Sequence, residues 1–146
     1  MSKIAIICTS YHKKEINRML KKVEEVSKSM DHIEISDVYW VPGALEIPYA
    51  LKKIEKSLKH DPEVEGVDGY VVLGIIERGE TDHGLVMGQA VIRQLIKFQT
   101  KKGKPIGVGI IGPGAEPKQI DERIEMHAEN AIMAVEYLLR EPNEWK

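Results

Sequence analysis

The sequence predicts an α/β protein in which one parallel sheet of four strands carries helices on both faces. Four short runs rich in valine and isoleucine are the candidate strands: Ile4–Cys8, Ile33–Val41, Tyr70–Ile76 and Ile106–Ile111. Each is followed by a longer segment with a helical pattern: Lys13–Met30, Ala44–Leu58, His83–Thr100 and Pro117–Leu139. Strict alternation of strand and helix favours a three-layer sandwich with a parallel sheet.

Local sequence features support the individual elements. The first run holds the only cysteine, Cys8, which we expect to pack as a small apolar residue. A turn with two prolines and a glycine, residues 41–48, leads into the second helix, and Glu116 is expected to cap the last one. The runs at 70–76 and 106–111 are apolar throughout, as strands buried on both faces are. Together these elements form a flavodoxin-like or Rossmann-like sheet.

Composition and charge narrow the classes of protein. With 146 residues and a formal net charge of -2, we expect one compact domain, residues 1–146, that binds neither nucleic acid nor membrane. Lysines cluster only beside acidic residues or in a connection, and no apolar stretch approaches the roughly 20 residues that span a bilayer. The lone cysteine cannot form an internal disulfide, and no signal-peptide pattern is visible, so we expect a cytoplasmic protein.

Polar residues and glycines gather directly after the predicted strands, in residues 9–12, 41–46, 77–83 and 112–114. Because ligands of open parallel sheets bind at the carboxyl ends of the strands, these segments are the candidate site. The last segment is only loosely like a glycine-rich phosphate loop, because it lacks the spacing of a dinucleotide fingerprint and the Gly-Lys-Ser/Thr ending. A dinucleotide site is therefore not expected.

The strongest candidate is the segment from Arg78 to His83. A glycine and Thr81 precede a helix that is expected to begin near His83, and helix amides beside a hydroxyl suit a phosphate. The alternative is that Thr81 or Asp82 only caps the helix. His83 would lie beside a bound anion and, because it titrates near neutral pH, can transfer protons, although a lone histidine is more often structural.

Two other residues have both a functional and a structural interpretation. Tyr11 follows the first strand without an apolar periodicity, so it either stacks on a flat heterocycle or packs as an ordinary aromatic. Arg123, in the first turns of the last helix, either binds a ligand or belongs to a solvated charged face. The five histidines and one cysteine show no metal-ligand spacing, and no nucleophile–base motif is present, so we expect no metal.

Three motifs together make the chain similar to the lumazine synthase family, from Ile4 to about Leu139. Residues 41–48, VPGALEIP, resemble the family's VPGAFEIP, and residues 74–83, GIIERGETDH, resemble its GAVIRGETxH. The third motif is GIIGPG at residues 109–114, followed by Glu122 and Arg123, which resembles the archaeal-type form of the last loop and helix.

The resemblance implies a step of riboflavin biosynthesis, the condensation of 5-amino-6-ribitylaminouracil with 3,4-dihydroxy-2-butanone 4-phosphate to 6,7-dimethyl-8-ribityllumazine. It implies no metal or organic cofactor, a Tyr11 ring stacked on the uracil, and proton transfer by His83. The remaining positions are assigned to the ribityl chain (Ala44, Leu45, Glu46), the pyrimidine (Ile75, Ile76, Glu77) and the phosphate (Glu80, Thr81). Val108 and Arg123 would reach the pocket of a neighbouring subunit, with active sites at the interfaces of a pentamer or a multiple of it.

The sequence departs from the family pattern at several positions. Gly84 and Leu85 stand where the family usually has an aromatic and an acid, Glu77 replaces an aliphatic residue, and His127 a common lysine. The changed residues at 77, 84 and 85 leave open a non-catalytic or ligand-binding paralogue of the same oligomeric fold. The intact motif around His83 disfavours an archaeal-type riboflavin synthase. A flavodoxin or receiver-like module is disfavoured because the acidic cluster or hydroxyl-rich first loop of such proteins is absent from the sequence. Glycines common in the last helix of capsid-forming members are absent, so we favour a pentamer-based assembly without choosing between pentamer, decamer and sixty-subunit shell.

Overall fold

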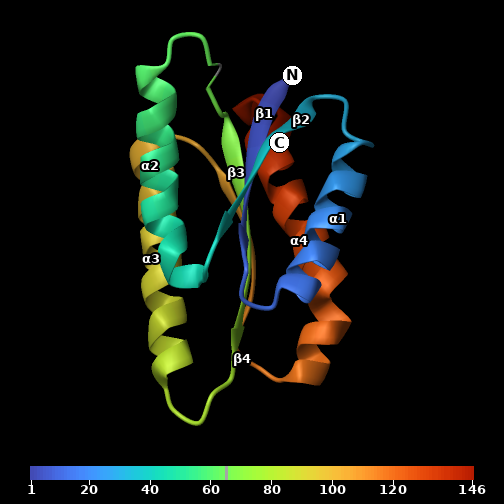
Figure 1. Ribbon diagram of the computed structural model, residues 1–146. Helices are drawn as coiled ribbons and strands as arrows, with labels where there is room; N and C mark the ends of the chain where they lie inside the picture. The colour runs from blue at the N-terminus through green and yellow to red at the C-terminus, as the bar shows by residue number, and fades with distance from the viewer. Residues whose placement is uncertain (65) are drawn as a thin grey trace.

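The computed structural model describes residues 1–64 and 66–146, which form a four-stranded sheet with helices on both faces (Figure 1). The strands are β1 (Ser2–Thr9), β2 (Ile33–Val41), β3 (Gly69–Glu77) and β4 (Ile106–Ala115). The helices are α1 (Lys13–Ser27), α2 (Ile47–His60), α3 (His83–Lys102) and α4 (Pro117–Leu138), with short 3-10 turns η1 (Ala44–Glu46) and η2 (Pro142–Trp145). The predicted three-layer, flavodoxin-like α/β sandwich is confirmed.

The sheet is parallel, with the strand order β2-β1-β3-β4. From β1 the chain crosses to β2 at one edge and then returns past β1 to add β3 and β4 on the other side. The two directions diverge between β1 and β3, and such a divergence leaves a crevice at the carboxyl ends of these strands. In Figure 1 this is the lower end of the sheet, where the turn leading into α3 lies.

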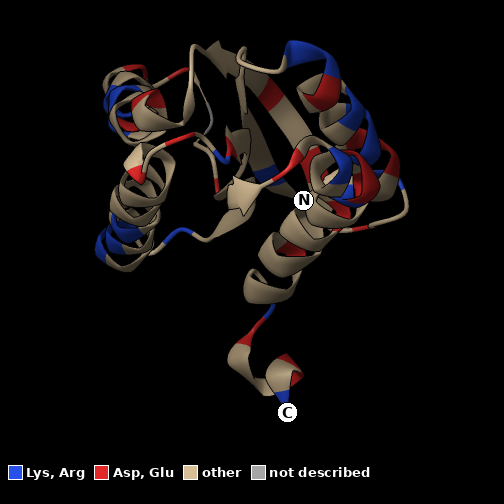
Figure 2. Ribbon diagram, turned by 90° about the horizontal axis from the view of Figure 1, so that it is seen from below, with Lys and Arg blue, Asp and Glu red and all other residues tan. Residues whose placement is uncertain are grey.

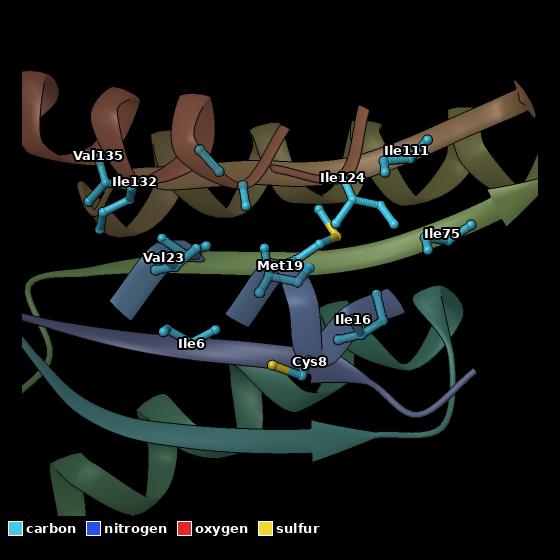
Figure 3. Close-up of a cluster of buried hydrophobic side chains, with 14 of the residues drawn as sticks. Ile6, Cys8, Ile16, Met19, Val23, Ile75, Ile111, Ile124, Ile132 and Val135 are labelled. Atoms are coloured by element: carbon cyan, nitrogen blue, oxygen red, sulfur yellow. The ribbon is translucent and has the colours of Figure 1, made fainter. Parts of the chain in front are cut away.

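Two apolar layers hold the helices onto the sheet. Alternate residues of β1 point to opposite faces, as the two-residue period of a strand requires. Ile4, Ile6 and Cys8 face α1 and α4, whereas Ala5 and Ile7 face α2 and α3. Figure 3 shows the first layer, in which side chains of α1 and α4 meet those of the sheet. The sheet is thus buried on both faces, and polar chemistry is left to its ends and edges.

Charged residues lie mainly on the helices and the connections, with both signs intermixed (Figure 2). Within residues 1–64 and 66–146, no helix combines the length and the apolar character needed to cross a bilayer.

The structure moves the ends of several predicted elements. The second helical segment begins as the 3-10 turn η1, which follows Gly43 in an extended conformation, and α2 proper starts at Ile47. The first helix ends at Ser27, whose hydroxyl bonds the carbonyl of Glu24. Residues 112–114, expected as a loop, lie within β4 as an irregular stretch without partners on β3, between Ile111, which pairs with Ile75, and Ala115, which pairs with Glu77.

Candidate functional site

A cleft of about 380 Å³ opens at the carboxyl ends of β1 and β3, where the strand order diverges. Four segments line it: the turn after β1, the η1 turn, the end of β3 and the start of α3. The lining residues are Tyr11, Gly43, Ala44, Leu45, Glu46, Ile75, Ile76, Glu77, Arg78, Gly79, Thr81, His83, Gly84 and Met87. Nine of the twelve residues that the sequence nominates for the site therefore share one cavity wall.

Tyr11 presents its ring to this cleft rather than to the core. Its backbone N–H donates to the carbonyl of Pro42 at 3.1 Å, and Ser10 N–H donates to the carbonyl of Val41 at 2.8 Å, so the turn after β1 is tied to the end of β2. The side chain remains 57% exposed. A core-packed aromatic would be covered, so Tyr11 is not part of the apolar core.

The turn that leads into α3 leaves the start of the helix largely uncapped by side chains. Asp82 is the N-cap residue, yet its carboxylate makes no capping hydrogen bond, and only the Thr81 hydroxyl accepts a bond, from His83 N–H at 3.3 Å. The start of α4 is different, since Glu116 and Gln119 form a reciprocal capping box there. Unsatisfied N–H groups at a helix start attract an acceptor, so this turn can take an anion.

A second hollow of about 280 Å³ lies on the other side of the same turn. Glu80 lines this hollow and not the first cleft, together with Leu85, Pro113 and Gly114. The peptide segment from residue 77 to residue 82 thus forms a partition between the two hollows.

Two glycines allow α3 to lie directly on the strand ends. A side chain at Gly84 would begin 3.0 Å from the carbonyl oxygen of Glu77, and one at Gly88 would begin 2.9 Å from the ring of Pro113. Normal carbon–oxygen contacts are about 3.3 Å or longer, so a larger residue would lift the helix. At Gly84 this chain therefore has little room for a side chain between α3 and the end of β3.

His83 lies exposed in the first turn of α3 and lines the same cleft as Tyr11. The imidazole is thus available to a bound molecule rather than enclosed in the core. The charged residues around it are Glu46, Glu77 and Arg78, with Asp82 and Glu80 in the adjoining turn.

The sequence assigns no role to His12 or Met87, although His12 lies in the candidate segment 9–12. His12 Nε2 lies 2.8 Å from Glu77 Oε1, which joins the turn after β1 to the end of β3. A carboxylate at position 77, at the end of an apolar strand, needs a cationic or donor partner, and this is the signal that could have identified His12. Met87 lies one turn further into α3 and carries no polar group to mark it.

Val108 and Arg123 do not line either hollow of their own chain. Val108 is half-buried in the layer between the sheet and helices α2 and α3, and Arg123 is exposed on α4. Near it, burial and the positive charge of Arg123 lower the pKa of His127. In the part of the chain that the structure describes, no group of three or more His, Cys, Asp or Glu side chains could hold a metal ion.

Comparison with known proteins gives a consistent result. The sequence pattern of one family, described as 6,7-dimethyl-8-ribityllumazine synthase, matches residues 1–141. A protein of that name from Staphylothermus marinus is 35% identical over 135 residues, which are 92% of this chain and 85% of the relative. Another from Pyrobaculum calidifontis is 35% identical over 140 residues, 96% of this chain and 88% of the relative. One from Pyrobaculum arsenaticum is 34% identical, with the same coverage.

Proposed function

The chain belongs to the 6,7-dimethyl-8-ribityllumazine synthase family, and we propose that it condenses 5-amino-6-ribitylaminouracil with 3,4-dihydroxy-2-butanone 4-phosphate in riboflavin biosynthesis. The products are 6,7-dimethyl-8-ribityllumazine, phosphate and water. One observation carries the proposal: the exposed ring of Tyr11 and the imidazole of His83 line one cleft at the divergence of the strand order. A flat heterocycle stacked on the Tyr11 ring would lie in the same cavity as the His83 imidazole.

The aminouracil is assigned to the inner part of the cleft. Its ring stacks on Tyr11 and meets the end of β3, and its ribityl chain lies along the η1 turn, where Glu46 supplies a carboxylate for hydroxyl groups. The assignment is supported by the lining of the cleft, which includes both the η1 turn and the end of β3. The residues involved are Tyr11, Ala44, Leu45, Glu46, Ile75, Ile76 and Glu77.

The phosphate of the second substrate is assigned to the turn before α3. The amides near Glu80 and Thr81 and the Thr81 hydroxyl are the donors, in a segment where Asp82 does not cap the helix. Among the charged groups that line this turn, Arg78 is a cation but Glu77, Glu80 and Asp82 are acids. A phosphate dianion there calls for another cation, and we assign that role to Arg123 of a neighbouring subunit.

His83 is assigned to proton transfer. Imine formation, phosphate elimination and ring closure each move a proton, and a histidine can act in several such steps because it exchanges protons near neutral pH. The amides and the arginine stabilise the departing phosphate through preorganised charge. Holding two substrates together supplies a large further part of the acceleration, and no step requires a redox or metal cofactor.

We also propose that the enzyme is a cytoplasmic pentamer, or a multiple of it, with active sites completed across subunit interfaces. Large apolar side chains lie exposed on both helical layers: Leu45, Tyr49, Leu85, Val86, Ile96, Met126, Met133, Tyr137 and Leu138. Such surfaces favour association. Val108 and Arg123 lie outside the clefts of their own chain, which supports their assignment to the active site of a neighbouring subunit. Sedimentation velocity of the purified protein measures the assembly, and a monomer at micromolar concentration would contradict it.

The function is tested by mixing the purified protein with both substrates and following the absorbance and fluorescence of the lumazine. We expect product between about pH 6 and 8.5, and at least a roughly tenfold lower rate for His83→Ala. His60→Ala is the matched control, because His60 is an exposed histidine at the far end of α2. Arg123→Ala should raise the KM for the phosphorylated substrate. A folded wild-type protein that makes no lumazine would instead favour the ligand-binding paralogue.

A further inference from the structure

His12 has a backbone conformation that is unusual for its residue type. Its φ is 61° and its ψ is 41°, and among the described residues it is the only non-glycine residue with a positive φ. Its carbonyl accepts the first hydrogen bond of α1, from Ile16 N–H at 2.9 Å, so the conformation starts the helix. Histidine is tolerated in the left-handed region better than most residues, but such outliers persist only where the surroundings hold them in place.

The imidazole of His12 contacts two residues of the cleft wall. Its Nε2 lies 2.8 Å from Glu77 Oε1, a close polar contact without the geometry of a regular hydrogen bond. Its ring meets the ring of Tyr11 edge to face, with centroids 4.3 Å apart and an angle of 68° between the planes. The Nε2 atom itself is inaccessible to solvent. The histidine is therefore wedged between the aromatic and the acid.

Tyr11 and Glu77 come from opposite sides of the divergence in the sheet, one after β1 and the other at the end of β3. The Tyr11 side chain is 57% exposed, so it has little other packing to fix its ring. A ring that must be ordered when a ligand binds costs affinity, whereas a ring already held does not. The contact with the His12 ring holds the Tyr11 ring in place before a ligand binds.

Resting on the proposed function, we infer that His12 is a positioning residue, which holds the Tyr11 ring and the Glu77 carboxylate so that the cleft accepts the heterocyclic substrate. His12 itself lines neither hollow, so it does not touch the phosphorylated substrate assigned to the turn before α3. The contribution of His12 is therefore selective: it sets the affinity for the flat ring and leaves phosphate binding unchanged.

The first test uses His12→Asn in the full-length protein. Asparagine also tolerates the left-handed conformation, so the start of α1 is kept while the imidazole is removed. We expect the KM for the aminouracil, and the Kd of the lumazine product from fluorescence titration, to rise roughly three- to tenfold, as the loss of an edge-to-face pair allows. The KM for the butanone phosphate and kcat should stay within about twofold. His60→Asn is the matched control and should change neither constant.

A double-mutant cycle with Glu77→Ala tests whether the two side chains act as a unit. Glu77→Ala alone should raise the product Kd by a similar factor, and it leaves the cap of α1 intact if His12→Asn proves unstable. The double variant should be about as weak as the single variants, because neighbouring groups that act together are not additive. Independent, multiplicative effects would overturn the inference, as would an unchanged Kd in a folded His12→Asn.

The two proposals fail in different ways. If the wild-type protein binds lumazine but does not form it, the proposed reaction is refuted. The role of His12 is then tested by the fluorescence titration alone. If the wild-type protein forms lumazine and the His12 variants bind lumazine as tightly as the wild type does, only the proposed role of His12 is refuted. If both KM values rise together in His12→Asn, the residue is merely structural and the inference is wrong.

Discussion

The contact between α4 and the sheet depends on the absence of a side chain at Gly107. A Cβ atom there would lie 2.0 Å from the carbonyl oxygen of Ala131 and 2.7 Å from its carbonyl carbon. Both are backbone atoms within α4, so no rotamer change can relieve the clash. Carbon–oxygen contacts below about 3.3 Å are rare, so Gly107→Ala requires the helix to withdraw from β4 by more than about 1 Å.

The expected loss of stability in Gly107→Ala follows from the buried side chains of α4 that would move away from the sheet. Ala128, Ile132 and Val135 of α4 belong to the layer against the sheet and are almost fully buried. Overpacking of a tight core typically costs about 1–3 kcal/mol, and we expect the upper end here because the clash involves backbone. For a chain of this length, about 3 kcal/mol corresponds to a Tm lowered by roughly 6–12 °C.

The assay is thermal unfolding followed by circular dichroism at one fixed protein concentration, because self-association shifts Tm. Gly66→Ala is the matched control, since its Cβ would have no atom within 4 Å and we expect its Tm to change by less than about 2 °C. Because α4 also carries Arg123, Gly107→Ala should raise the KM for the phosphorylated substrate as well. A Tm equal to that of the control would refute the reasoning.

Three further predictions concern the core and the titration of buried groups. Thiol reagents should not label Cys8 in the folded protein at pH 8, because burial raises the pKa of its thiol to about 12, and labelling before unfolding would contradict this. Ile124→Ala should lower the free energy of unfolding by about 2–5 kcal/mol in urea, whereas the exposed neighbour Glu122→Ala should change it by less than about 0.5 kcal/mol. Because the folded state lowers the pKa of His127 from 6.5, the unfolded chain binds that proton first. The free energy of unfolding should therefore fall as the pH drops through about 6.5, and parallel curves for wild type and His127→Gln would show that another group is responsible.

The elements themselves are largely predictable because their signals are local. The apolar runs mark the strands to within a few residues, and the second strand is predicted with its observed ends, Ile33 and Val41. Errors occur where an end depends on neighbours, as at residues 112–114, which the sequence marks as a loop because of two glycines and a proline. Beyond them Ala115 pairs with Glu77 of β3, a non-local interaction that the apolar pattern of β4 alone does not contain.

The placement of the site is also predictable in outline. Parallel strands bring their carboxyl ends to one edge of the sheet, so Tyr11 and His83 are expected together although 71 positions separate them in the chain, and both line one cleft. The separation of Glu80 into a second hollow does not follow from the same rule, because it depends on how the turn before α3 is folded.

Sequence by itself determined which segments are strands and helices, and which strand ends carry polar groups, because periodicity and residue type act over a few neighbouring positions. Only the tertiary structure decided how closely the layers approach. It placed the α4 backbone where Gly107 leaves room, laid α3 over the strand ends at Gly84, and set His12 against Glu77. Such contacts join residues far apart in the chain, and their distances follow from the packing of whole elements, which no local pattern encodes.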